Sequence, residues 1–214
     1  MALIGVLTGD IVGSTKIEGN DRDFLLSLIK SLLLQNADRE TGAVDIFRGD
    51  SFQLVLSSAA SAVKAAISIR SGLMFNTPAR FSSLWDARIS VGIAFEEYRG
   101  QDVGTSDGEA FRLSGRKLDE MKASRLAIQT EVESFNNELA VEAGFVDDIV
   151  THWSRNQAHV AHMYCRPTIP PTKEIAKNLN VSNQRINQLY HSAKVPLLLP
   201  FFSRFENMIN SIVQ

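Results

Sequence analysis

The sequence predicts an α+β protein: a palm, or ferredoxin-like, domain over residues 1–140, followed by a small all-α domain over residues 141–214. Apolar segments alternate in the order strand, helix, strand, strand, helix, strand. That order is typical of folds in which two helices cover one face of an antiparallel sheet. The stretch "CRPTIPPTKE" then interrupts the pattern with three prolines, because proline lacks an amide donor and disfavours helical backbone in the residue before it.

Each element of the palm domain has its own signal. Residues 2–9 are nearly all apolar, as expected for a central strand buried on both faces. Between residues 21 and 39, apolar side chains recur every three or four positions, which predicts a helix. The remaining elements are two strands joined by a Gly-Asp turn in "AVDIFRGDSFQLVLS", a helix over 59–74, a strand over 86–96, a helix over 108–119 and a strand over 124–129.

Composition excludes several classes of protein. The chain has 214 residues, of which 44% are hydrophobic, and no apolar run approaches the roughly 20 residues that span a bilayer. The single cysteine, Cys165, excludes an internal disulfide framework. We therefore expect a cytoplasmic protein without a membrane partner. The net charge is −2, but residues 145–214 carry seven Lys and Arg against four Asp and Glu, which permits nucleic-acid contact there.

The first strand ends at an aspartate beside a loop of small residues, "GDIVGSTK". A carboxylate alone repels phosphate, so this arrangement favours a cation between Asp10 and a bound anion. Asp50 provides the second ligand, because the end of the first strand in a palm sheet lies beside the hairpin between the second and third. Two carboxylates are hard oxygen ligands that suit Mg²⁺ or Mn²⁺. The alternative interpretation is that both acids only stabilise turns.

The loop after Asp10 is predicted to hold the phosphate that the metal bridges. The backbone amides from Val12 to Thr15 and the hydroxyls of Ser14 and Thr15 are suitable donors. Gly13 permits close approach because it has no side chain.

Three segments resemble the class III nucleotide cyclases. "GDIVGST" and "FRGDSFQLVL" are similar to the two metal-binding segments of that superfamily, and "GEAFRLSGR" to the third, which carries an arginine that stabilises the transition state. Together with the C-terminal helices, the motifs most resemble the SatD family. The resemblance implies a nucleoside triphosphate ligand, a metal site at Asp10, Ile11 and Asp50, and a homodimer in which Arg116 serves the partner's site. The alternative for Arg116 is an ordinary solvated residue of the helix.

The sequence also departs from the cyclase pattern. The two positions that resemble the base pocket are Ile46, which cannot hydrogen-bond a base edge, and Thr105, where cyclases have an aspartate. Arg112 stands where cyclases use a ribose-orienting asparagine. We expect Arg112 and Arg116 to neutralise charge that develops at the phosphorus.

Residues 172–195 have the spacing of a helix-turn-helix. Thr172 is a predicted N-cap, Asn180 suits a left-handed turn, and Ser182 can cap the second helix. Asparagine and glutamine side chains can read adenine, and basic side chains can contact phosphate. The predicted DNA-binding residues are Asn183, Gln184, Arg185, Gln188 and Lys194. The alternative is the polar outer face of a small interaction domain.

The sequence therefore predicts a metal-dependent nucleotide-binding protein of class III cyclase type, fused to a DNA-binding helix-turn-helix. A nucleotidyl cyclase or a related phosphoryl-transfer enzyme is one form of this prediction. The alternative is a non-enzymatic, DNA-binding transcriptional regulator whose cyclase-like domain senses a nucleotide or only dimerises.

Overall fold

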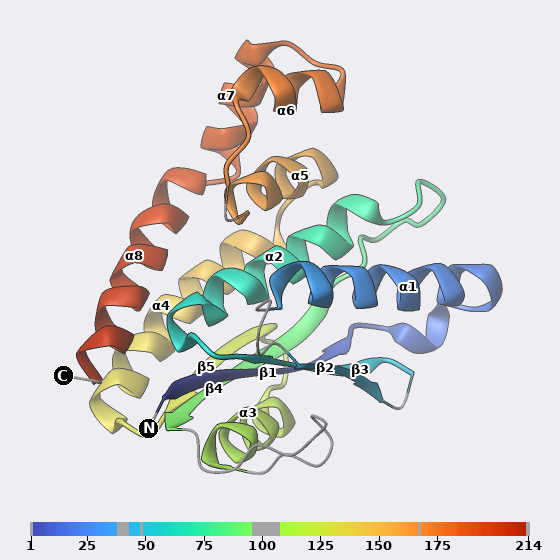
Figure 1. Ribbon diagram of the computed structural model, residues 1–214. Helices are drawn as coiled ribbons and strands as arrows, with labels where there is room; N and C mark the ends of the chain where they lie inside the picture. The colour runs from blue at the N-terminus through green and yellow to red at the C-terminus, as the bar shows by residue number, and fades with distance from the viewer. Residues whose placement is uncertain (1, 38–42, 48, 96–107, 167, 213–214) are drawn as a thin grey trace.

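A computed structural model of the chain describes residues 2–37, 43–47, 49–95, 108–166 and 168–212 (Figure 1). Its centre is a five-stranded sheet with the order β2-β3-β1-β4-β5. The strands are β1 (Leu3–Ile11), β2 (Ala43–Phe47), β3 (Ser51–Leu56), β4 (Ala87–Phe95) and β5 (Leu126–Thr130). β1 is antiparallel to both β3 and β4, as the palm pattern predicts.

The last strand differs from the predicted antiparallel sheet. β5 pairs with β4 in parallel. Between these two strands the chain forms helix α3 (Glu109–Glu120), and a helical crossover returns the chain to the same end of the sheet. The prediction of a wholly antiparallel sheet was therefore wrong at this edge.

Helices α1 (Gly19–Asn36) and α2 (Ala62–Asn76) cover one face of the sheet, which confirms the predicted two-helix layer (Figure 1). A short 3₁₀ turn, η2 (Ala59–Ser61), leads into α2. The main hydrophobic core lies between this layer and the sheet and includes Ile29 and Leu33 from α1, Ile67 from α2 and Leu7 from β1. Side chains spaced by three and four residues thus meet the strand side chains that point to the same face.

Helix α3 lies on the opposite face of the sheet (Figure 1). A smaller cluster forms there, with Val6 of β1 and Ala110 of α3 among its members. The helix sits very close to β4: a Cβ atom added to Gly92 would lie 2.1 Å from the carbonyl oxygen of Ala110. Glycine at position 92 is therefore required for α3 to pack on the sheet.

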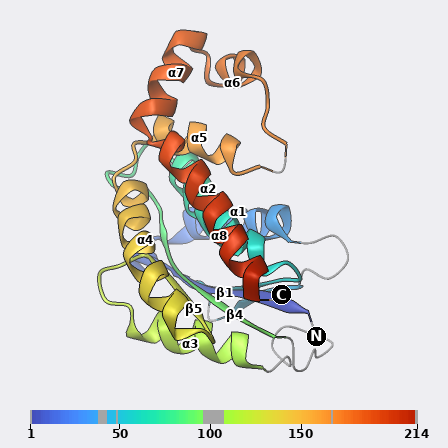
Figure 2. The same cartoon turned by 90° about the vertical axis from the view of Figure 1, so that its left-hand side faces the viewer.

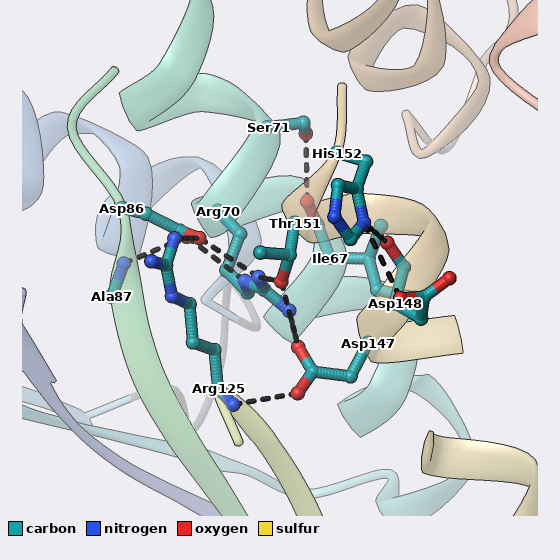
Figure 3. A network of polar contacts seen from close by, with 10 residues as sticks. All are labelled: Ile67, Arg70, Ser71, Asp86, Ala87, Arg125, Asp147, Asp148, Thr151 and His152. Atoms are coloured by element: carbon teal, nitrogen blue, oxygen red, sulfur yellow. Dashed lines mark hydrogen bonds and ion pairs between the residues drawn. The ribbon is translucent and has the colours of Figure 1, made fainter. Parts of the chain in front are cut away.

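A buried ion-pair network joins α2 and helix α4 (Glu133–Thr151) to Asp86, the residue before β4 (Figure 3). The guanidinium of Arg70 donates to Asp86 from Nε (2.9 Å) and Nη2 (2.8 Å), and to Asp147 from Nη1 (2.7 Å). Arg125 donates to Asp86 through Nη1 and to Asp147 through its backbone N–H. Burial alone would lower the pKa of Arg70, but the charges and hydrogen bonds of Asp86 and Asp147 raise it above the ordinary value.

The chain continues as α5 (Arg155–Tyr164), α6 (Thr172–Leu179), α7 (Asn183–Ser192) and α8 (Val195–Ile212). Helix α8 runs back alongside the palm layers (Figure 2). Its side chains Phe205 and Ile209 join the main core. The indole N–H of Trp153 donates to the carbonyl of Ala193 over 2.9 Å, which ties the start of α5 to the end of α7. Residue 140, the predicted domain boundary, lies inside α4. The division into two domains stays a prediction.

Helix α5 packs on α2 through His162, which is 3% exposed. Its Nδ1 lies 3.0 Å from the carbonyl of Ser68 and 3.2 Å from the hydroxyl of Ser71. Burial lowers the pKa of His162 to about 4; the hydrogen bond to Ser68 opposes that effect, while Arg166 and His159 add to it. Among the helices of the described ranges, none is both long and apolar enough to cross a membrane.

Candidate functional site

The two predicted metal-binding aspartates lie at one end of the sheet. Asp10, near the end of β1, is the cross-strand partner of Ser51, the residue that follows Asp50. The N–H of Ile11 donates to the carbonyl of Asp50 over 3.1 Å. Pairing of β1 with β3 therefore brings together two acids that are forty residues apart in the chain.

The loop after β1 contacts the turn between β2 and β3. Gly13 adopts a left-handed conformation, with φ of 68°, and a 3₁₀ turn, η1 (Ser14–Lys16), follows it. The hydroxyl of Ser14 donates to Oδ2 of Asp50 over 2.7 Å. The loop is thus held against one of the two carboxylates.

The structure changes the predicted set of phosphate donors. The N–H of Val12 donates to the carbonyl of Asp86 over 2.9 Å, so this amide is not free for an anion and its prediction as a phosphate donor was wrong. The hydroxyl of Ser14 is likewise engaged with Asp50. The amides of Gly13, Ser14 and Thr15 begin the 3₁₀ turn, where N–H groups lack helical partners, and Thr15 is exposed. A phosphate role for these three residues stays a prediction.

Arg88 is the main site residue that sequence reasoning missed. It lies on β4 directly opposite Asp10, and its Nε donates to Oδ1 of Asp10 over 2.9 Å while Nη2 pairs with Oδ2. Nη1 donates to the carbonyl of Met121, at the end of α3, over 2.9 Å. The hydrogen bond to Asp10, together with the charges of Asp10 and Asp119, raises the pKa of Arg88 against the opposing effect of burial.

The site offers oxygen ligands, the type that a hard divalent cation prefers. Asp10 and Asp50 offer carboxylates, and Ile11, whose side chain is buried, could offer only its carbonyl. The guanidinium of Arg88 nevertheless bonds both oxygens of Asp10, so a cation that binds Asp10 does so next to a positive charge. Within the described ranges, no three His, Cys, Asp or Glu side chains come together as a metal site.

The predicted base-pocket residues receive no support. Ile46 packs against the main core, on the α1 side of the sheet. The polar row on the α3 side instead passes through Gln53, which donates to Thr8 over 3.1 Å, and Ser114 of α3, which bonds Thr8 over 2.8 Å. Strand alternation points the side chain of Ile46 away from this row, and the correspondence of Ile46 to a base-pocket position stays a prediction. Thr105 lies outside the described residues.

The two predicted catalytic arginines lie on α3. Arg112 donates from Nε to Glu109, one turn earlier, over 2.9 Å. Arg116 is exposed on the same helix. Its role across a dimer interface and the alternative of a solvated helix residue both stay predictions.

The predicted helix-turn-helix segment forms α6 and α7. Asn180 takes the left-handed conformation, with φ of 53°, and Ser182 caps α7 by accepting from the N–H of Arg185, as predicted. Helix α6 begins at Thr172 and its N-cap is Pro171, one residue before the predicted cap. The predicted DNA-binding side chains are all exposed: Asn183, Gln184, Arg185, Gln188 and Lys194. Their contact with DNA stays a prediction.

No family model matches the sequence, and no curated protein matches it either. A search of solved structures finds similarity to the GGEEF domain of a diguanylate cyclase from Vibrio cholerae, with 14% identity over 61% of this chain and 84% of that chain and a TM-score of 0.44. The adenylyl cyclase CyaB from P. aeruginosa has 19% identity over 64% and 82%, with a TM-score of 0.46. The guanylyl cyclase Cya2 has 18% identity over 65% and 81%, with a TM-score of 0.40. At these values the similarities do not identify a reaction or a ligand for this chain.

Proposed function

We propose that this chain is a cytoplasmic nucleotide-binding protein of class III cyclase type that takes a nucleoside triphosphate together with Mg²⁺ or Mn²⁺ at the end of β1. The observation that carries the proposal is the placement of Asp10 beside Asp50, with the Gly13 loop bonded to Asp50 through Ser14. Two carboxylates lie next to a 3₁₀ turn whose first N–H groups lack helical partners. Together they suit a metal-bound phosphate chain. The motif resemblance to the SatD family is consistent with this proposal.

The residues have separate roles in this proposal. Asp10, Asp50 and the carbonyl of Ile11 hold the cation, which when bound neutralises phosphate charge. Residues 13–15 contact phosphate oxygens. Arg112 and Arg116 lie on α3 and balance negative charge at the reacting phosphorus, with Arg116 acting across a two-fold homodimer. Ring closure by a nucleotidyl cyclase, or a related phosphoryl transfer, is the chemistry that such an arrangement supports.

Calorimetry with Mn²⁺ and each nucleoside triphosphate tests the proposal. We expect Mn²⁺ with triphosphate to bind the wild type, and binding to be lost in Asp10→Asn and in Asp50→Asn. Asp23→Asn is the matched control, because Asp23 is an exposed acid on α1. Unchanged binding in both site variants would overturn the metal site. Separation of the products by mass then reports whether a reaction occurs, and sedimentation reports the dimer.

A second candidate function is a non-enzymatic, DNA-binding regulator whose palm domain senses the nucleotide or only dimerises. The observation that favours it is the exposed polar face of α7, which follows a capped start at Ser182 and contains no acid. Arg185 and Lys194 would contact phosphates, while Asn183, Gln184 and Gln188 would read base edges.

Anisotropy of labelled duplexes over a salt series tests this second candidate. Arg185→Ala should weaken binding to every duplex and reduce the logarithmic salt slope by roughly 0.9 for one lost phosphate contact. Gln184→Ala should mainly relax sequence preference. Asn210→Ala, an exposed change on α8, should leave both properties unaltered. A wild type that binds no duplex at low salt would exclude the regulator.

A further inference from the structure

The Asp10 carboxylate already has a cationic partner. Arg88 meets it edge on, with Nε and Nη2 facing the two carboxylate oxygens, and the strand register holds the two residues opposite each other. The side chains are 32% and 23% exposed for Arg88 and Asp10. The pair is thus partly shielded from water and yet open to a ligand from solvent.

We infer that Arg88 competes with the divalent cation for Asp10, so that the site takes the cation only together with a phosphate chain, to which the guanidinium then transfers. This inference rests on the proposed function. It assigns Arg88 a role in cation selection and phosphate binding, and it makes the two ligands bind interdependently.

Electrostatics explains why the free cation alone is disfavoured. A divalent ion at Asp10 would stand next to the guanidinium of Arg88, and two adjacent positive groups repel each other. Asp50 relieves only part of this repulsion, because Asp10 and Asp50 together bring two negative charges against the three positive charges of the divalent ion and Arg88. A free ion therefore has to break the ion pair between Arg88 and Asp10, and no new anion replaces Asp10 as the partner of Arg88.

A phosphate chain removes both costs. Its oxygens match the planar donor geometry of a guanidinium as well as a carboxylate does, and residues 13–15 place it beside Asp10. The hydrogen bond from Nη1 of Arg88 to the carbonyl of Met121 leaves one anchor in place while the other two nitrogens change partner. That anchor lies at the end of α3, the helix that also carries Arg112 and Arg116.

The test measures Mn²⁺ binding by electron paramagnetic resonance and by calorimetry, first with Mn²⁺ alone and then with Mn²⁺ and inorganic triphosphate. In Arg88→Met, we expect free Mn²⁺ to bind about tenfold more tightly than in the wild type, because one adjacent positive charge is gone. The affinity for the Mn²⁺–triphosphate complex should fall by about tenfold, because a charged phosphate contact is lost. Arg88→Lys should keep the discrimination against free Mn²⁺ but lose part of the triphosphate affinity.

Arg80→Met is the control, since Arg80 forms an exposed pair with Asp21 on other elements; it should change neither affinity. Thermal unfolding checks that each variant is folded. If the wild type binds free Mn²⁺ as tightly as Arg88→Met, or if Arg88→Met binds the triphosphate complex normally, the inference is overturned while the nucleotide site stands. If no variant binds Mn²⁺ with or without triphosphate, the proposed function fails, and the inference fails with it.

Discussion

The hydroxyl of Ser14 and the carboxylate of Asp50 are joined by a 2.7 Å hydrogen bond across a sequence separation of 36 residues. The bond connects the loop that follows β1 to the turn that precedes β3. Asp50 therefore has a fixed position relative to the Gly13 loop before any ligand arrives. In the proposed site this preorganisation places the second carboxylate next to the predicted phosphate donors.

Replacement of Ser14 tests this connection. Ser14→Ala removes the only side-chain donor from the loop to Asp50 found in the described residues, and we expect the free energy of unfolding to fall by about 1 kcal/mol. Affinity for Mn²⁺ with triphosphate should fall as well. Urea unfolding and calorimetry measure the two effects. Ser27→Ala, whose exposed hydroxyl bonds carbonyls of its own helix, should change neither, and equal effects of the two variants would contradict the prediction.

The network around Arg70 should dominate the stability of the palm layers. Arg70→Met leaves Asp86 paired with Arg125 alone and leaves Asp147 without a cationic side-chain partner in the network (Figure 3), and breaking a buried pair in this way costs about 3 to 5 kcal/mol. Urea unfolding monitored by circular dichroism gives the value. Arg80→Met removes an arginine whose side chain is 64% exposed and should cost about 0.5 kcal/mol or less. A comparable loss in both variants would show that burial of the network is not the cause.

His162 should make stability depend on pH. Its pKa is lowered to about 4 in the fold, mainly by burial, whereas an unfolded histidine titrates near 6.5. The unfolded state therefore binds a proton first, and stability should be complete above about pH 6.5 and decline as the pH falls toward 4, by about 3 kcal/mol at most.

Unfolding in urea at several pH values between 7.5 and 4.5 measures this dependence. His162→Asn can retain a hydrogen bond to Ser68 without the titrating ring. The part of the change in unfolding free energy with pH that His162 causes should therefore disappear. His191→Asn is the matched control, because His191 is exposed at the end of α7. If the unfolding free energy of His162→Asn falls with pH as much as that of the wild type, groups other than His162 cause the decline.

Cys165 should react slowly in the native state. Burial raises the pKa of its thiol to about 12, although the charge of Lys64 opposes the shift, and the thiolate is the reactive form. Ellman's reagent at pH 8 should label the native chain much more slowly than the chain in urea. In a Cys165→Ser background, Ser203→Cys places a thiol at an exposed position of α8 and should react at once. Rapid native labelling of Cys165 would contradict the burial of this side chain.

The sequence was sufficient to predict the palm layers because their patterns are local. The apolar run of β1 and the spacing of Ile29 and Leu33 on α1 each depend on a few neighbouring residues. The positions of Asp10 and Asp50 then follow from strand order. The parallel pairing of β5 was missed because the prediction placed every strand in an antiparallel sheet, whereas a helix between two neighbouring strands returns the chain to the same end of the sheet and makes the pair parallel.

Arg88 shows why the site was predicted only in part. An arginine in a strand looks like a solvent-facing residue, and its pairing with Asp10 depends on a register between segments that are 78 residues apart. The side of the sheet to which Ile46 points also depends on strand register, because a shift of one residue turns a side chain to the other side. Both features result from strand pairing, which composition and periodicity do not encode.

The hydrogen bond between Trp153 and Ala193 fixes an intrinsic fluorophore at the junction of the C-terminal helices. The chain has two tryptophans, and Trp153 is buried where α4, α5 and the end of α7 meet. Trp85 is buried beside Phe24 and Phe81, next to Asp86, whose carbonyl holds the N–H of Val12. Emission from one indole thus follows the C-terminal helices and emission from the other follows the loop at the end of β1, so single-tryptophan variants can observe the two ends of the molecule separately without any attached dye.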